Sequence, residues 1–190
     1  MSPSRVAINE LIELVLRRPP RLGPVRAIAI DGPSGAGKTQ FARALKDQLQ
    51  EQRGTSTAIV PCDAFATWDN PVAWWPTLEA TVLEPLASGR PGSYQALEWI
   101  NGVPRPGPWY AVPVVDFLIL EGVSSARRSI AARLTASAWI GWGDDQARLE
   151  AAVNRDGEDS RAHLQRWQRF EHGWFPIDGA QHRADIRVTG

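Results

Sequence analysis

The chain has 190 residues, of which 43% are hydrophobic and 22% are charged, as is typical of one globular domain with a full core. Its 21 basic residues balance 21 acidic ones, so charge gives no reason to expect nucleic acid or an anionic membrane as a partner. The single cysteine, Cys62, excludes an internal disulfide and favours a reducing, cytoplasmic location. We see neither a secretory signal nor an apolar run long enough to cross a membrane.

The first predicted element is a helix over residues 4–18, where apolar side chains recur along one face. Pro19 and Pro20 end this helix, because the residue before a proline disfavours helical backbone. We interpret residues 1–20 as a packing helix outside any active site. The apolar run from Val25 to Ile30 then indicates a buried strand.

The next residues match the phosphate-binding pattern GxxxxGK[ST]: Gly32, Pro33, Ser34, Gly35, Ala36, Gly37, Lys38 and Thr39. A strand precedes the pattern, and apolar residues at helical spacing follow it, which is the context that this loop needs. Glycines let the backbone amides wrap around a polyphosphate, and the helix N-terminus favours negative charge. Lys38 can reach the β- and γ-phosphates and the Thr39 hydroxyl can bind Mg²⁺. The alternative is a glycine-rich turn that binds nothing.

The central part of the chain contains a second short strand, Thr57–Pro61, which leads directly to Asp63. Residues 64–112 are rich in tryptophan, proline and glycine. We predict a helix over residues 76–87 and then an irregular stretch with turns at residues 89–92 and 104–108. So long a connection inside a compact domain is typical of a binding region, and we interpret it as the acceptor-binding segment.

The C-terminal part alternates strands and helices. Residues 114–120 form a nearly continuous apolar run, as expected of a central strand covered on both faces, and Glu121 follows it. Further strands are predicted at residues 136–140 and 184–188, and helices at residues 127–134, 145–154 and 162–172. The pattern predicts a single α/β domain over residues 1–190, a three-layer sandwich around a mostly parallel five-stranded sheet.

The phosphate loop gives nucleotide binding but not the type of reaction. GTPases need an Asn-Lys-x-Asp segment, which is absent here, and mechanical ATPases usually end the central strand in aspartate, whereas here the acidic residue is Glu121. From Ala27 to Val188 the sequence resembles the uridine kinase and phosphoribulokinase family of small-molecule kinases. The stretches that carry this resemblance are Asp31–Thr39, Asp63–Phe65, Trp68–Trp74, Leu118–Gly122, and Arg148, Arg155, Asp156 and Arg161.

The resemblance implies a P-loop kinase fold with a short helical lid at residues 154–161. It also implies that ATP and Mg²⁺ are used to phosphorylate a hydroxyl of a small metabolite, a nucleoside or a related compound. In this reading Lys38 binds phosphate, and Asp63 is the general base and helps to hold Mg²⁺ through water. Glu121 holds a metal-bound water, and Arg155 and Arg161 neutralise charge from the lid.

On the acceptor side, the resemblance implies that Trp68, Asp69 and Tyr94 bind the substrate. An aromatic face can stack on a planar base, and a carboxylate can accept hydrogen bonds from sugar hydroxyls. Core packing is the alternative role for Trp68. The family's Tyr-x-Phe segment with its nearby histidine is replaced here by Gln95–Trp99 after Tyr94. We therefore predict a kinase without predicting uridine as its acceptor.

Two other functions stay open. A nucleoside monophosphate kinase would need an arginine cluster for the acceptor phosphate, and residues 64–112 contain only Arg90 and Arg105. A non-catalytic, ATP-binding regulatory protein would have no need of Asp63 as a base. The expected partner is a small-molecule hydroxyl acceptor, and the sequence leaves open whether the chain forms a homo-oligomer.

Overall fold

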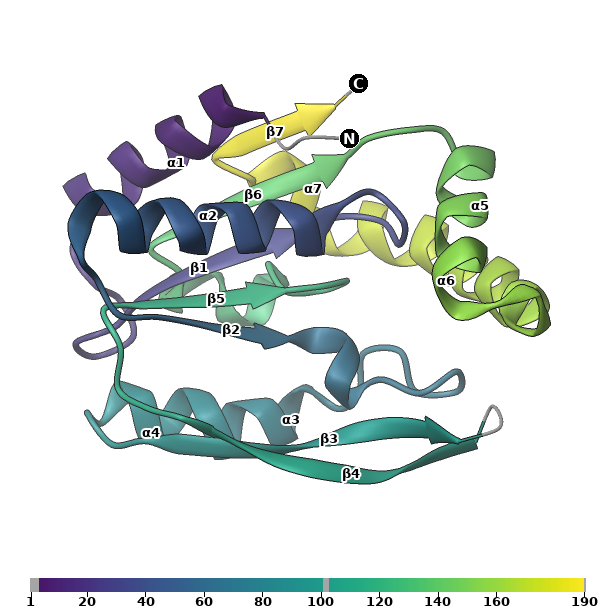
Figure 1. Ribbon diagram of the computed structural model, residues 1–190, viewed down its shortest axis with the longest axis horizontal. Helices are drawn as coiled ribbons and strands as arrows, with labels where there is room; N and C mark the ends of the chain where they lie inside the picture. The colour runs from purple at the N-terminus through teal and green to yellow at the C-terminus, as the bar shows by residue number, and fades with distance from the viewer. Residues whose placement is uncertain (1–3, 101–102, 190) are drawn as a thin grey trace.

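The computed structural model describes residues 4–100 and 103–189, which fold around a parallel five-stranded sheet (Figure 1). The strand order is β2-β5-β1-β6-β7, and every pairing is parallel. The strands are β1 (Arg26–Asp31), β2 (Thr57–Pro61), β5 (Phe117–Glu121), β6 (Ala136–Gly141) and β7 (Ile186–Thr189). The predicted sheet is confirmed, and the central strands are buried because helices cover both faces.

Alternate side chains of the sheet enter two separate cores. Ile28 and Ile119 face α1 (Arg5–Arg17) and α2 (Lys38–Arg53), while Ala29 and Leu120 belong to the core on the opposite face. That second face is covered by one helical stretch, α3 (Trp75–Leu78), a π-helical turn (Glu79–Leu83) and α4 (Glu84–Ala87), and by α7 (Ala180–Arg183). Figure 1 shows α1 and α2 on one side of the sheet and α3 and α4 on the other.

A long antiparallel hairpin replaces part of the stretch predicted to be irregular. It consists of β3 (Gly92–Ile100) and β4 (Val103–Val112), and the turn predicted at residues 104–108 is wrong. Pro104 and Pro106 pair with Trp99 and Leu97 within this hairpin. Proline cannot donate to a second neighbour, but in the described part of the chain β4 pairs with β3 alone, so its other edge needs no donors.

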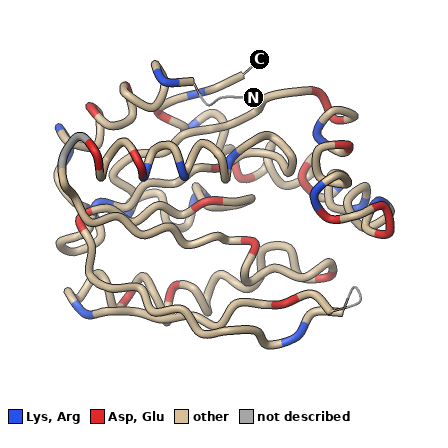
Figure 2. The backbone as a smooth tube through the Cα atoms, in the orientation of Figure 1, with Lys and Arg blue, Asp and Glu red and all other residues tan. Residues whose placement is uncertain are grey.

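The C-terminal helices form a second hairpin that projects beyond the carboxyl ends of the strands (Figure 1). It contains α5 (Asp145–Asp156), a 3-10 turn (Glu158–Ser160) and α6 (Arg161–Asp178), and we call it the α5–α6 hairpin. Figure 2 shows acidic and basic residues mixed along it. The helix predicted at residues 127–134 is a 3-10 helix instead (Arg128–Arg133). Among the described helices, none combines the length and the apolarity that crossing a membrane requires.

Candidate active site

The phosphate loop lies between the end of β1 and the start of α2, so the backbone amides of the first turn of α2 face the loop. Gly35 has a φ of +78°, and a Cβ there would lie 2.2 Å from the carbonyl oxygen of Arg148 in α5. Only glycine therefore lets the loop pass this closely under the α5–α6 hairpin. Gly37 also has a positive φ, +93°, and a Cβ there would meet nothing within 4 Å, which leaves open space at the mouth of the loop.

The Thr39 side chain points to Glu121 at the end of β5, whereas the Lys38 side chain turns back on the phosphate loop. The Lys38 ammonium donates to the carbonyl oxygen of Pro33 at 2.9 Å, and the Lys38 side chain is 7% exposed. The Thr39 hydroxyl lies 3.3 Å from both carboxylate oxygens of Glu121. Burial and, to a smaller extent, the charge of Asp63 raise the pKa of Glu121.

These side chains fit a Mg²⁺ ion that is shared with a nucleotide. Mg²⁺ usually keeps several waters and takes one or two protein oxygens together with substrate phosphates. A hydroxyl and a carboxylate that converge, as in Thr39 and Glu121, match this pattern. Within the described residues there is no cluster of three or more His, Cys, Asp or Glu side chains that could form a closed metal cage.

Asp63 follows β2 in a short 3-10 turn, Cys62–Phe65, and its carboxylate is exposed to solvent. The register pairs Pro61 with Glu121, so the two carboxylates leave neighbouring strands at the same edge of the sheet. Gly122 makes this approach feasible, because a Cβ there would lie 3.1 Å from an Asp63 carboxylate oxygen and 2.9 Å from the Cβ of Cys62. Close packing at the end of β5 therefore favours a glycine at position 122.

Asp31, which the sequence analysis did not assign, holds the start of the phosphate loop. Its fully buried carboxylate accepts hydrogen bonds from the backbone N–H groups of Gly32 (2.7 Å), Ser124 (3.1 Å) and Ala126 (2.8 Å). Burial outweighs these bonds and raises the pKa of Asp31 to about 6. The loop and the segment after β5 are thus fixed to one another by one side chain.

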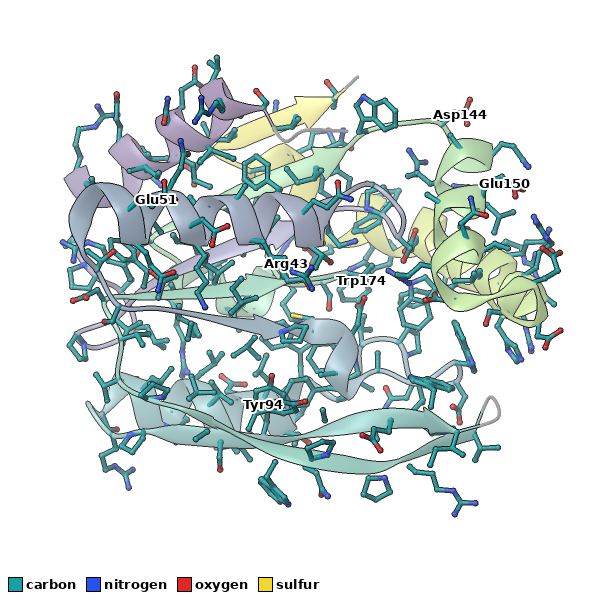
Figure 3. All side chains as sticks on the ribbon, in the orientation of Figure 1. Arg43, Glu51, Tyr94, Asp144, Glu150 and Trp174 are labelled. Carbon is teal, nitrogen blue, oxygen red and sulfur yellow. The ribbon has the colours of Figure 1, made fainter. Side chains whose placement is uncertain are left out.

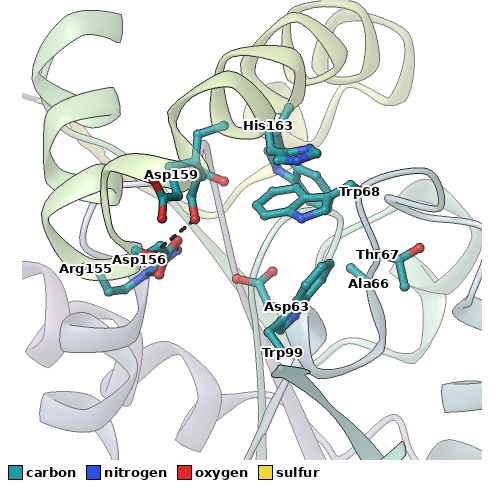
Figure 4. A pocket seen from close by; sticks show the side chains of 13 residues that line it. Asp63, Ala66, Thr67, Trp68, Trp99, Arg155, Asp156, Asp159 and His163 are labelled. Carbon is teal, nitrogen blue, oxygen red and sulfur yellow. Dashed lines mark hydrogen bonds and ion pairs between the residues drawn. The ribbon is translucent and has the colours of Figure 1, made fainter. Parts of the chain in front are cut away.

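A cavity of about 800 Å³ opens beside the phosphate loop (Figure 4). Its walls come from four parts of the chain: the loop, the segment after β2, the tip of β3 and the α5–α6 hairpin. The lining residues are Ser34, Asp63, Ala66, Thr67, Trp68, Trp99, Arg155, Asp156, Asp159, Ser160, His163, Leu164 and Trp167. Three of the predicted site residues, Asp63, Trp68 and Arg155, thus line one cavity.

Aromatic rings form one wall of this cavity. Trp68 stacks on His163 with ring centroids 5.0 Å apart and an interplanar angle of 16°. Trp99 of β3 lies 5.0 Å from Trp68, and Trp167 of α6 meets it edge-on at 6.0 Å. The sequence analysis did not assign Trp99, His163 or Trp167, because their contacts with Trp68 are long-range.

The two arginines of the predicted lid differ in position. Arg155 lies in the last turn of α5, lines the cavity and is bound in a fork by the carboxylate of Asp156, with two contacts of 2.6 Å. Arg161 is not among the residues that line the cavity. Its guanidinium is held by the carboxylates of Glu150 and Glu158, so the structure does not support the catalytic position expected for it.

Two of the three predicted substrate residues also lie elsewhere. Tyr94, labelled in Figure 3, is 6% exposed. It packs between Phe65 and Tyr110, with ring centroids 5.2 and 5.4 Å away. It belongs to the core beneath the β3–β4 hairpin. Asp69 accepts a hydrogen bond from the Thr67 hydroxyl at 2.9 Å within a local turn and does not line the cavity. Neither residue therefore lines the cavity.

Glu171 is a site residue that the sequence analysis missed. One oxygen of its carboxylate accepts hydrogen bonds from the N–H (3.0 Å) and the hydroxyl (2.6 Å) of Ser34 in the phosphate loop. The side chain is 2% exposed. A signal was present, because Leu164, Trp167 and Glu171 recur on one face of α6. A charged residue at such a buried position needs a partner, and the phosphate loop supplies it.

Comparison with solved structures identifies proteins of the same fold. A protein from Bacillus stearothermophilus, provisionally identified as a uridine kinase, superposes with a TM-score of 0.69 at 17% identity and covers 97% of this chain and 98% of its own. A provisionally identified fructose transport system kinase from Silicibacter gives 0.58 at 19% identity, covering 95% and 98%. A D-glycerate 3-kinase from Cryptococcus neoformans gives 0.50 at 14% identity, covering 96% and 71%.

At these identities the likeness shows a shared fold, and the α/β fold with a mostly parallel five-stranded sheet that the sequence predicted is confirmed. No family model matches the chain, and no curated protein matches it. The acceptors named for these structures differ from one another, so the fold does not choose among them.

Proposed function

We propose that the chain is a kinase that transfers the γ-phosphoryl group of Mg·ATP to a hydroxyl of a small metabolite. The observation that carries this proposal is the convergence of four groups at one edge of the sheet. Lys38 and Thr39 begin α2, Glu121 ends β5 and Asp63 follows β2, so all four lie at the carboxyl edge of the sheet, where Asp63 and Ser34 of the phosphate loop line the cavity. In open α/β sheets, ligands bind at this carboxyl edge.

Each group has a role that its position supports. Lys38 and the loop amides bind the phosphates, and Thr39 and Glu121 hold Mg²⁺ directly or through water. The acceptor oxygen forms a bond to the γ-phosphorus as the bond to the β–γ bridging oxygen breaks, and ADP leaves. The hydroxyl proton passes to the carboxylate of Asp63, which is exposed to the cavity and has no ion-pair partner among the described residues.

Arg155 is the cation that can stabilise charge on the transferred group. It lines the cavity, and the charges of Asp63 and Glu121 act on its guanidinium. To contact a phosphate it must leave the carboxylate of Asp156, which now binds it. Arg155 then exchanges one anionic partner, the carboxylate of Asp156, for another, the phosphate. This exchange needs only a local movement of the end of α5.

Phosphorylation of a nucleoside monophosphate has less support. An acceptor phosphate needs cations of its own, and Arg155 is the only arginine or lysine among the residues that line the cavity in the described part of the chain. The same arginine is required by the γ-phosphate. A hydroxyl acceptor that carries no phosphate is therefore favoured.

The test is ADP release from Mg·ATP, screened over nucleosides, sugars, vitamins and their monophosphates. We expect stimulation by an unphosphorylated hydroxyl compound, and loss of that stimulation in Asp63→Ala with ATP binding retained. Equal stimulation in Asp63→Ala would remove the base assignment. Tight ATP binding with no stimulation by any compound would favour the regulatory alternative.

A further inference from the structure

The charges that border the cavity do not balance. Three carboxylates line it, those of Asp63, Asp156 and Asp159, against one guanidinium, that of Arg155. Asp156 binds Arg155 in a fork and neutralises it. Asp63 and Asp159 form no ion pair with any side chain in the described part of the chain. The acceptor space thus carries an excess of negative charge before any nucleotide is bound.

Three cations on the elements that border this space, Lys38, Arg161 and Arg166, are engaged elsewhere. Lys38 donates to Pro33 inside the phosphate loop, where it serves the nucleotide. Arg166 lies one turn along α6 from His163 and contacts its Nδ1 at 3.1 Å, outside the lining residues. Arg161 is held by two glutamates. None of these side chains compensates Asp63 or Asp159.

Three indole rings border the same space. Trp68, Trp99 and Trp167 come from separate segments and meet with centroids 5.0 and 6.0 Å from that of Trp68. Trp99 is 39% exposed, so part of its ring stays available to a ligand. Figure 4 shows Asp159 with Asp156 and Arg155 on one side, Trp68 and Trp99 on the other, and the carboxylate of Asp63 between them. The π-face of an indole is the best aromatic surface for a cation, and carboxylates opposite it add to the attraction.

We infer that the acceptor is a hydroxyl compound that carries a positive charge, such as a quaternary ammonium alcohol or a nucleoside with a cationic base. The charge lies between the indoles of Trp68 and Trp99 and the carboxylate of Asp159, and the hydroxyl reaches Asp63. A cavity of about 800 Å³ has room for a compound of this size. The inference rests on the proposed kinase activity and adds the chemical class of the acceptor.

The test compares acceptors in pairs that have the same shape and different charge. One pair is choline and 3,3-dimethylbutan-1-ol, and the other is 3-methylcytidine, cationic at neutral pH, and 3-methyluridine. We expect the cationic member of the preferred pair to have a kcat/KM for ADP release about tenfold or more above its neutral partner, as cation–π contact and a facing carboxylate imply. Uridine 5′-monophosphate, an anionic acceptor, should be the poorest.

Variants locate the preference in the cavity. Asp159→Asn and Trp68→Leu should each reduce the ratio of cationic to neutral kcat/KM several-fold, because each removes a group that attracts the positive charge. Glu98→Gln is the matched control, because Glu98 is exposed beside Trp99 on β3 and does not line the cavity. It removes the same charge and should leave the ratio unaltered. A general loss of folding would reduce both members equally.

The outcomes separate this inference from the proposed function. Faster turnover of the neutral or anionic members would overturn the inference and leave the kinase assignment intact. If no compound supports ADP release, the kinase assignment fails. Calorimetric binding of the same pairs to the protein then decides whether the cavity prefers a cationic ligand. Weaker or equal binding of the cationic members, or no binding by any of them, would overturn the inference.

Discussion

Glu171 of α6 accepts two hydrogen bonds from Ser34 of the phosphate loop, 137 residues away in the sequence. Burial raises the pKa of Glu171, while the nearby Lys38 charge and the two bonds from Ser34 oppose that rise. The carboxylate thereby joins the helix that lines the acceptor cavity to the loop that cradles phosphate. A displacement of α6 must either carry Ser34 with it or break two bonds.

Changes at Glu171 should therefore alter nucleotide binding although α6 lies outside the loop. We expect Glu171→Ala to raise the KM for ATP roughly tenfold, since hydrogen bonds to a charged group contribute about 1.5–3 kcal/mol. Ser34→Ala should have a smaller effect because the loop N–H remains. In the double variant the two effects should be less than additive, as for residues in direct contact. Strict additivity in ATP titrations of the four proteins would contradict the coupling.

Asp63→Asn tests the base without changing the shape of the side chain. General base catalysis contributes about 10²–10⁴-fold, so kcat should fall by about that factor while the KM for ATP changes little. Asp69→Asn is the control, because Asp69 is bound to Thr67 outside the cavity. A loss of activity in the Asp69 variant as large as that in the Asp63 variant would show that the cavity has been assigned to the wrong carboxylate.

Thr39→Val and Glu121→Gln should share one phenotype. Both remove an oxygen that we assign to Mg²⁺, so half-maximal activity should require several-fold more Mg²⁺, and saturating metal should restore part of the rate. The measurement is a Mg²⁺ titration of ADP release at fixed ATP. Lys38→Ala is the comparison, because it should lower activity at every Mg²⁺ concentration.

Tyr94 provides a prediction that separates packing from substrate binding. The ring is buried between Phe65 and Tyr110, so Tyr94→Ala should lower the free energy of unfolding by about 3 kcal/mol or more. Tyr94→Phe keeps the ring and should leave the KM for the acceptor unchanged. A large rise of the KM for the acceptor in Tyr94→Phe, with stability retained, would show instead that the Tyr94 hydroxyl contacts the acceptor.

Asp31 should make stability depend on pH in the acidic range. Its folded-state pKa of about 6 lies above the ordinary value of 3.8, so the folded protein binds a proton more readily than the unfolded chain does. The stabilisation is complete below the ordinary pKa and is lost as the pH rises through about 6, a decrease of about 3 kcal/mol.

Denaturant unfolding of the native protein and of Asp31→Asn, from about pH 4 to about pH 7, measures this difference. The other carboxylates are present in both proteins, so their contributions to the pH dependence cancel in the difference between the two curves. The native curve should fall relative to that of the variant as the pH rises. Parallel curves would mean that the three N–H donors hold Asp31 ionised throughout.

The sequence predicted the features that depend on neighbouring residues. The order GPSGAGKT specifies the phosphate loop by itself, and the apolar runs that became β1 and β5 predicted the parallel sheet, because period and hydrophobicity are local properties. Asp63 and Glu121 could be placed at one edge of the sheet because parallel strands end together. The segment with Pro104 and Pro106 was misassigned, since proline predicts a turn unless the strand lies at an edge, and only strand order decides that.

Tertiary structure alone decided which side chains meet. Several contacts join segments that are far apart in the sequence, and no local sequence pattern predicts that these segments meet. They are the hydrogen bond between Glu171 and Ser34, the contacts of Trp68 with Trp99 and Trp167, and the ion pair of Arg161 with Glu150. An arginine beside a turn can bind a phosphate or form an ion pair with a carboxylate, and the local sequence around it does not distinguish these two roles. Local sequence thus determined the phosphate loop and the sheet, while long-range packing determined the shape and charge of the acceptor cavity.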